Sequence, residues 1–223
     1  MEAAMGYFDK DLFTFLNGLK RNNKREWFQA HKDSFEADVK EPFLDFISDV
    51  GPQLRRISPN LLADPRPVGG SLFRIYRDVR FSKDKSPYKT HAGAHFQLGG
   101  KGVHGPGYYL HLEAGQCFVA GGMWMPDPKA LQMIRDRIAE KPAEWKKVRG
   151  TLDHPEDSLK RPPHGFDADH PMIEDIKRKS FTASKKLSDK QVTSEDFMKT
   201  FVGACRDISP MMKFLASAVG VRW

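Results

Sequence analysis

Residues 90–98 read THAGAHFQL and residues 107–114 read GYYLHLEA, and these two runs decide the fold. In each run apolar side chains recur at every second position, and polar residues such as His91, His95 and His111 fall between them. Alternation with a period of two is the pattern of a β-strand that buries one face. The connection between the runs is short and rich in glycine, so we expect an antiparallel hairpin.

The same alternation continues on both sides of this hairpin. Residues 71–81 place Phe73, Ile75 and Phe81 on one face, and residues 117–123 form a further apolar run. Short connections favour antiparallel pairing, because parallel strands need long crossovers. The sequence therefore predicts an antiparallel sheet over about residues 71–125.

Helical spacing replaces this pattern at both ends of the chain. Apolar residues follow helical spacing over residues 8–50, starting after Asp9, and again from Asp127-Pro128 onward. We predict a single α+β domain over residues 1–223, in which the sheet is packed by N-terminal and C-terminal helices.

Several boundaries follow from local signals. Asn23 is predicted to cap a second helix, with Glu26 three residues later completing a capping box. Pro210 is predicted to begin the last helix. Three segments are predicted to be loops because of their prolines, glycines or missing apolar stripe, namely residues 58–70, 150–170 and 176–190.

The charge is unevenly distributed. The chain of 223 residues has a formal net charge of +7, and residues 71–105 hold seven basic and two acidic groups, a net of +5. A localised positive field attracts phosphates, carboxylates or nucleic acid, but a solvated surface can carry the same charge.

Membrane and secretory signals are missing from the sequence. No apolar run approaches the roughly 20 residues that span a bilayer, and the start of the chain lacks the pattern of a signal peptide. Cys117 and Cys205 lie far apart without metal-type spacing. We therefore expect a reduced, cytoplasmic protein that does not bind membranes, and the sequence leaves its oligomeric state open.

Residues 74–89, RIYRDVRFSKDKSPYK, hold six cations, two carboxylates and two tyrosines. Within a strand, Arg74 and Arg80 would share one face and could fork onto a phosphate or carboxylate. Arg77 would fall on the buried face, where it needs a bulge or a carboxylate partner. The predicted ligand-binding residues are Arg74, Tyr76, Arg77, Arg80, Lys83, Lys85 and Lys89. Alternatively, Asp78 and Asp84 pair with their neighbours and the remaining cations are solvated.

Strand register predicts a second group. Matching apolar residues across the hairpin pairs Phe96 with Leu110 and places His95 opposite His111, with Glu113 one diagonal step away. Such a group could bind a divalent metal through all three residues, or the two histidines could act as catalytic acid and base. The spacing within each strand is no metal signature. It favours the simpler interpretation, a polar sheet face with two ordinary histidines and no cofactor.

Four segments together resemble the domain of unknown function 2461 family, which occurs mainly in bacteria. They are residues 22–28 (NNKREWF), 73–91 (FRIYRDVRFSKDKSPYKTH), 108–111 (YYLH) and 121–128 (GGMWMPDP). The resemblance covers most of the chain and implies a single domain. It implies no reaction, ligand or catalytic residue, so no role is transferred to any position.

The sequence is consistent with three functional hypotheses. The preferred one is a site for a small anionic, phosphorylated ligand on the basic strand and sheet face, with or without an enzymatic reaction. The second is a nucleic-acid-binding or protein-interaction module, in which nucleic-acid binding would be weak and non-specific. The third makes the basic motif purely structural. A concave site favours the first, and an extended basic surface favours the second.

Overall fold

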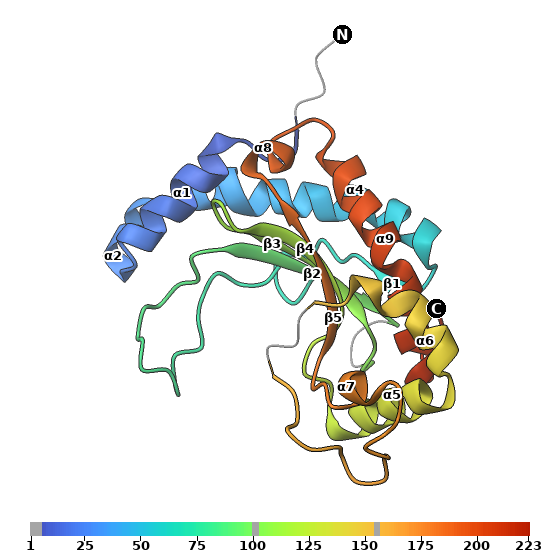
Figure 1. Ribbon diagram of the computed structural model, residues 1–223. Coiled ribbons are helices and arrows are strands. Elements are labelled where there is room, and N and C mark those ends of the chain that lie inside the picture. The colour runs from blue at the N-terminus through green and yellow to red at the C-terminus, as the bar shows by residue number, and fades with distance from the viewer. Residues whose placement is uncertain (1–5, 100–102, 154–156) are drawn as a thin grey trace.

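The computed structural model describes residues 6–99, 103–153 and 157–223, so part of each of the predicted loops at 99–106 and 150–170 lies outside the described residues. Helices and strands combine in an α+β fold with an antiparallel sheet (Figure 1). The elements in chain order are α1 (Lys10–Arg21), α2 (Arg25–Ala30), α3 (Lys32–Phe35), the π-helix η1 (Glu36–Lys40), α4 (Glu41–Ile57), β1 (Leu61–Leu62), β2 (Ala92–Leu98), β3 (Gly107–Leu112), β4 (Cys117–Met123), α5 (Pro128–Glu140), α6 (Pro142–Val148), the 3₁₀-helix η2 (Arg149–Thr151), α7 (Ile173–Ile176), β5 (Phe181–Leu187), α8 (Asp189–Val192) and α9 (Phe197–Ala218).

Two of the predicted helix starts are confirmed in detail. Asp9 caps α1, and its side chain accepts a hydrogen bond from the Asp11 amide. Asp127 caps α5 in the same way and accepts from the amides of Lys129 and Ala130. Aspartate at this position satisfies amides that have no partner inside the helix.

The described sheet has five antiparallel strands in the order β1-β2-β3-β4-β5. Strands β2, β3 and β4 lie where alternation predicts them. The sheet extends beyond the predicted range, because β1 falls in the predicted loop at 58–70 and β5 in the predicted loop at 176–190. In β5 the apolar positions Phe181, Ala183 and Leu187 are buried. Lys185 interrupts them and pairs with Asp207 of α9. Strand β5 is an edge strand of the described sheet, and charged side chains are common on edge strands.

Helices α4 and α9 cover one face of the sheet (Figure 1). Phe96 of β2 packs edge-on against Phe46 of α4 and Phe201 of α9. The buried Tyr108 hydroxyl donates to the Cys205 carbonyl of α9 at 2.8 Å. This face holds the hydrophobic core, and the opposite face of β2, β3 and β4 is half-buried and carries most of the polar side chains.

The predicted strand over residues 71–81 is wrong. Leu72 makes one bridge to Ala94 of β2, after which the chain leaves the sheet and makes one further bridge, Tyr76 to Tyr88, within its own excursion. This excursion, residues 71–91, is the long sea-green trace beside β2 in Figure 1. Its apolar residues share no buried face, because Ile75 is 5% exposed whereas Phe81 is 95% exposed.

Side chains within the excursion explain why it forms no regular strand. Asp78 accepts from the Arg80 amide and Asp84 accepts from the Ser86 amide, each two residues on. Such Asx turns compete with a strand ladder for the backbone. Pro87 in the returning limb also has no amide to donate.

The predicted helix start at Pro210 is wrong as well, because α9 continues through it. Proline removes the amide that would bond to the Arg206 carbonyl. The Ser209 hydroxyl donates to that carbonyl at 2.8 Å instead, so the acceptor stays satisfied.

Cys117 and Cys205 are buried free thiols. Across the described residues, no helix is both long and apolar enough to cross a membrane.

Candidate site on the half-buried face of the sheet

The half-buried face of β2 and β3 is shaped by two glycines. Gly93 lies opposite His111, and His95 lies opposite Tyr109. A Cβ atom on Gly93 would be 2.5 Å from the Tyr109 hydroxyl oxygen, and one on Gly107 would collide with the His95 ring. The two rings therefore lie flat across the strands, in space that only glycine leaves open.

The predicted pairing of His95 with His111 is wrong. The observed ladder pairs Phe96 with Tyr108, a shift of two residues from the predicted register. A shift of two keeps every side chain on its predicted face but changes its neighbours. His95 stacks near Phe73, with ring centres 6.3 Å apart, so it does not complete the predicted metal group with His111 and Glu113.

His91 takes the place predicted for His95. One ligand atom from each of His91, His111 and Glu113 lies within 4.8 Å of the other two. His91 directly precedes β2, His111 lies in β3 and Glu113 directly follows β3. One step past the Ala92–Leu112 pair, the ladder brings His91 level with Glu113. We call these three residues the His91 cluster.

Neighbouring side chains hold the His91 cluster in place. His111 Nε2 lies 3.6 Å from Glu113 Oε2, and His111 Nδ1 lies 3.0 Å from the Tyr109 hydroxyl. The His111 ring stacks on Phe118, with ring centres 4.7 Å apart. Lys20, at the end of α1, donates to Glu113 Oε1 at 2.9 Å. The side chains of His111 and Glu113 are only 13% and 15% exposed.

Burial and the neighbouring charges together set the protonation states of the His91 cluster. It lowers the pKa of His91 to about 4, with further lowering from His111 and Lys89. Burial also lowers the pKa of His111, although Glu113 opposes this. For Glu113, burial raises the pKa, but Lys20 and His111 outweigh it and the net pKa is lowered. Two neutral imidazoles therefore face an ionised carboxylate at neutral pH.

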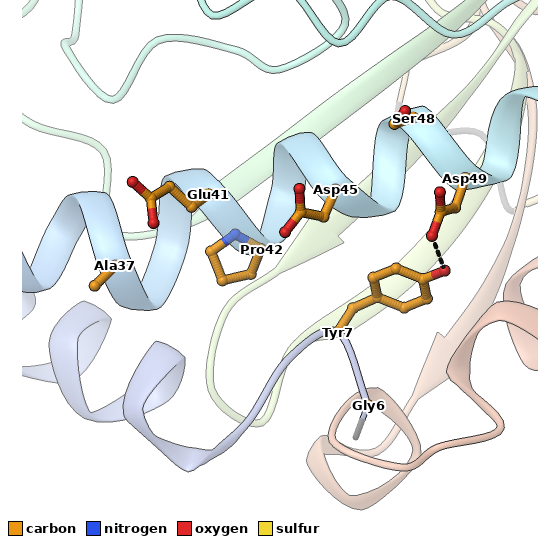
Figure 2. Close-up of a pocket in the computed structure, with 8 residues that line it drawn as sticks. All are labelled: Gly6, Tyr7, Ala37, Glu41, Pro42, Asp45, Ser48 and Asp49. Atoms are coloured by element: carbon orange, nitrogen blue, oxygen red, sulfur yellow. Dashed lines mark hydrogen bonds between the residues drawn. The ribbon is translucent and has the colours of Figure 1, made fainter. Parts of the chain in front are cut away.

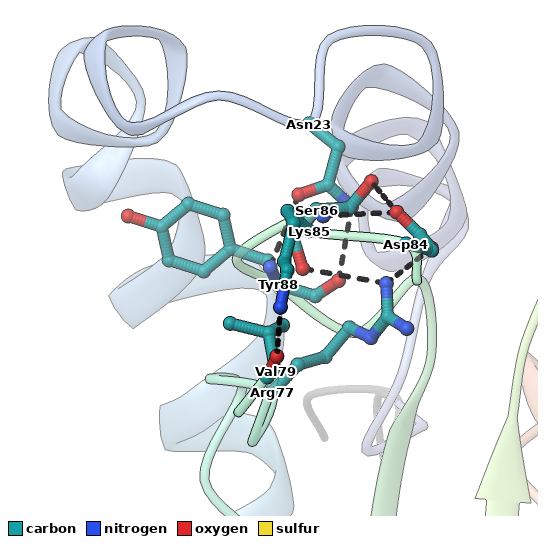
Figure 3. A network of polar contacts seen from close by, with 7 residues as sticks. All are labelled: Asn23, Arg77, Val79, Asp84, Lys85, Ser86 and Tyr88. Atoms are coloured by element: carbon teal, nitrogen blue, oxygen red, sulfur yellow. Dashed lines mark hydrogen bonds and ion pairs between the residues drawn. The ribbon is translucent and has the colours of Figure 1, made fainter. Parts of the chain in front are cut away.

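The basic residues of the excursion do not converge on one point. Arg77 pairs with Asp84 and donates to the Ser86 carbonyl, and Lys85 donates to the Val79 carbonyl (Figure 3). Asp84 is thus the carboxylate partner of Arg77, which is partly buried although it lies outside any strand. Hydrogen bonds from Ser86 and then from Arg77 hold the pKa of Asp84 well below its usual range.

Arg80 is also paired, since its guanidinium makes a two-pronged contact with Asp78, the shorter bond being 2.7 Å. Hydrogen bonds from Arg80 lower the pKa of Asp78. Lys83 is exposed, and Tyr76 is half-exposed with its ring 5.3 Å from that of Tyr88. These contacts match the alternative in which the acidic residues pair with their neighbours.

Lys89 and Arg74 differ from the other cations. The Lys89 ammonium donates to the Arg74 carbonyl at 2.7 Å and lies 5.4 Å from the centre of the Phe73 ring. Burial lowers the pKa of Lys89, and the charge of Arg74 lowers it further. Within the described part of the chain, neither cation forms an ion pair. Asp78, the carboxylate that senses Arg74, already binds Arg80.

Two shallow pockets lie elsewhere. One of about 490 Å³ runs along α4, where Glu41, Asp45 and Asp49 line one side, and the Tyr7 hydroxyl donates to Asp49 at 2.7 Å (Figure 2). Another of about 530 Å³ lies between β5 and α9. Neither is lined by a predicted site residue, so both are separate from the sheet face.

A family model described as "Conserved hypothetical protein (DUF2461)" matches residues 11–214. The chain belongs to this family. The match to DUF2461 includes Lys20, the whole excursion and the His91 cluster. No curated protein matched the chain.

Proposed function

We propose that this DUF2461 protein binds a small anionic, phosphorylated ligand on the half-buried face of the sheet, beside the base of the excursion. One observation carries the proposal. The Lys89 ammonium donates to the Arg74 main-chain carbonyl at 2.7 Å, the charge of Arg74 lowers the pKa of Lys89, and neither cation forms an ion pair with a described residue. Like charges held close together favour a bound anion, because it reduces their mutual repulsion.

Phe73 joins these cations to the histidine face. Its half-exposed ring lies beneath Lys89, 6.3 Å from the His95 ring and 5.9 Å from the Tyr109 ring. A ligand held by the two cations would have a flat apolar surface beside its charged group. Planar apolar surface next to a few convergent polar groups is typical of small-molecule sites.

His95 is the candidate for proton transfer in this site. Burial lowers its pKa, so its imidazole is neutral and can accept a proton. His111 is less suited to that role, because Tyr109 and Glu113 already contact both of its ring nitrogens. We therefore assign His95 to chemistry and His111 to holding the site together.

Calorimetry tests this proposal in buffer containing EDTA, which excludes binding through a metal. The panel comprises inorganic phosphate, sugar phosphates and nucleotides. We expect Arg74→Ala and Lys89→Ala each to weaken the best ligand by about 10- to 150-fold, the effect of losing a charged hydrogen bond of about 1.5–3 kcal/mol. Arg80→Ala is the matched control, because Asp78 already neutralises that cation.

Two results would contradict the proposal. One is that no phosphorylated compound binds the wild-type protein. The other is that Arg74→Ala and Lys89→Ala bind as tightly as Arg80→Ala. A single-stranded oligonucleotide belongs in the same panel. If it binds more tightly than every small ligand and weakens steeply between low and moderate salt, the nucleic-acid hypothesis replaces this one.

A further inference from the structure

The His91 cluster has the composition of a transition-metal site. Two imidazoles and one carboxylate form the ligand set of several catalytic zinc sites and of non-haem iron sites. A tetrahedral ion with bonds of about 2.0–2.2 Å separates its ligand atoms by about 3.3–3.6 Å. The 3.6 Å between His111 Nε2 and Glu113 Oε2 already matches this, and the third ligand atom lies within 4.8 Å.

The contacts around the cluster hold the outer atoms of His111 and Glu113 and direct their other ligand atoms toward one another. Tyr109 contacts Nδ1 of His111, which leaves Nε2 facing Glu113. Lys20 binds Oε1 of Glu113, which leaves Oε2 facing His111. Partners of this kind fix the tautomer and orientation of metal ligands and are a regular part of metal sites.

The positive charges of Lys20 and Lys89 disfavour a bound metal ion, but their electrostatic effect is limited. Lys20 is 53% exposed along its side chain, so water screens its charge. Lys89 acts on His91, but its ammonium is directed to the Arg74 carbonyl. Neither removes a ligand atom, since Lys20 takes the carboxylate oxygen that points away from His111. We therefore expect weaker binding than in a site without cations.

We propose that His91, His111 and Glu113 bind one divalent first-row transition-metal ion such as Zn²⁺. Three protein ligands leave a coordination position open, which is the arrangement of a catalytic rather than a structural zinc. The metal site does not depend on the proposed anion site. It adjoins that site through Lys89, so an anion held there would lie next to the metal.

The test uses full-length protein without a polyhistidine tag, stripped with EDTA and titrated with Zn²⁺ in buffer free of phosphate. We expect one Zn²⁺ per chain. His91→Ala and Glu113→Gln should each weaken Zn²⁺ binding by roughly 100-fold or more, and Tyr109→Phe by about 10-fold, in line with effects around known sites. His104→Ala, an exposed histidine outside the cluster, is the matched control.

Co²⁺ gives a second readout that needs no variant. We expect visible absorption bands of a low-coordinate Co²⁺ ion, without the thiolate band that Cys117 or Cys205 would add. Zn²⁺ binding below one equivalent in the wild type, a thiolate band, or full affinity in natively folded His91→Ala and Glu113→Gln would each overturn the metal site. Because Glu113→Gln preserves side-chain shape, the test stands even if a histidine variant fails to fold. Loss of the metal site would leave the EDTA-treated anion measurement unaffected.

Discussion

Asn23 lies between α1 and α2, and its side chain hydrogen-bonds to the base of the excursion. Substituting Asn23 tests how the excursion is anchored. The predicted N-cap role of Asn23 is wrong, because Lys24 occupies the N-cap of α2 and no side chain caps it. The Asn23 side chain instead accepts from the Tyr88 amide at 3.1 Å and donates to the Tyr88 carbonyl at 2.9 Å (Figure 3). Tyr88 is 2% exposed and stacks on Phe28 with ring centres 4.3 Å apart.

The cost of Asn23→Ala follows from these two bonds. Each hydrogen bond contributes about 0.5–1.5 kcal/mol net, and here both backbone partners would be left in a region with little access to water. We therefore expect a loss of about 1–3 kcal/mol in the free energy of unfolding. For a domain of this size, that corresponds to a fall in Tm of about 2–12 °C.

Urea denaturation measures this loss, and amide hydrogen exchange at Tyr88 locates it. Asn22→Ala is the matched control, because Asn22 is an exposed neighbour whose side chain donates to the Gly18 carbonyl of its own helix and to no other described residue. We expect Asn22→Ala to cost at most about 0.5 kcal/mol, as is usual for a surface change. Equal stability of the two variants, or unchanged exchange at Tyr88 in Asn23→Ala, would refute this account of how the excursion is anchored.

Three further substitutions test the sheet, helix α9 and the pocket along α4. Gly122→Ala should cost at least about 2 kcal/mol by urea denaturation, because its Cβ would collide with the Phe181 carbonyl at a φ of +135°. Gly203→Ala in α9 should instead add about 0.5–1 kcal/mol, since beyond its own helix backbone no described residue lies within 4 Å of the new methyl group. Burial and the bond to Asp49 raise the pKa of Tyr7 from 10.0 to about 12. The unfolded chain therefore loses this proton first, stability falls as pH rises from about 10 toward 12, and Tyr7→Phe should show a shallower fall.

Elements with a complete local signal were predictable from the sequence. Helix α5 begins where Asp127 and Pro128 together mark a start, and β4 lies where its apolar run predicts it. Capping and alternation depend on residues a few positions apart, so the sequence alone contains them.

Elements that depend on tertiary partners were not predictable in the same way. The excursion alternates like a strand. However, Asp78 and Asp84 bond to backbone amides two residues on, and these local turns replace the regular pairing of a strand with its neighbour. Strand β5, by contrast, is a strand without strand-like alternation, because Lys185 breaks its apolar pattern. Lys185 is tolerated in this strand because it pairs with Asp207 of α9. Residue patterns do not show which distant carboxylate will be available.

The candidate site shows why the correct face can be predicted while the correct neighbours are missed. Period-two alternation leaves any register that differs by two residues equally consistent with burial, so apolar matching could not separate the predicted pairing from the observed one. The glycines carry the missing information. Gly93 and Gly107 make room for the Tyr109 and His95 rings only when Gly93 faces His111 and Gly107 faces Gln97. That register places His91 beside Glu113. On this face, the positions of the glycines therefore indicate which side chains are neighbours better than the apolar pattern does.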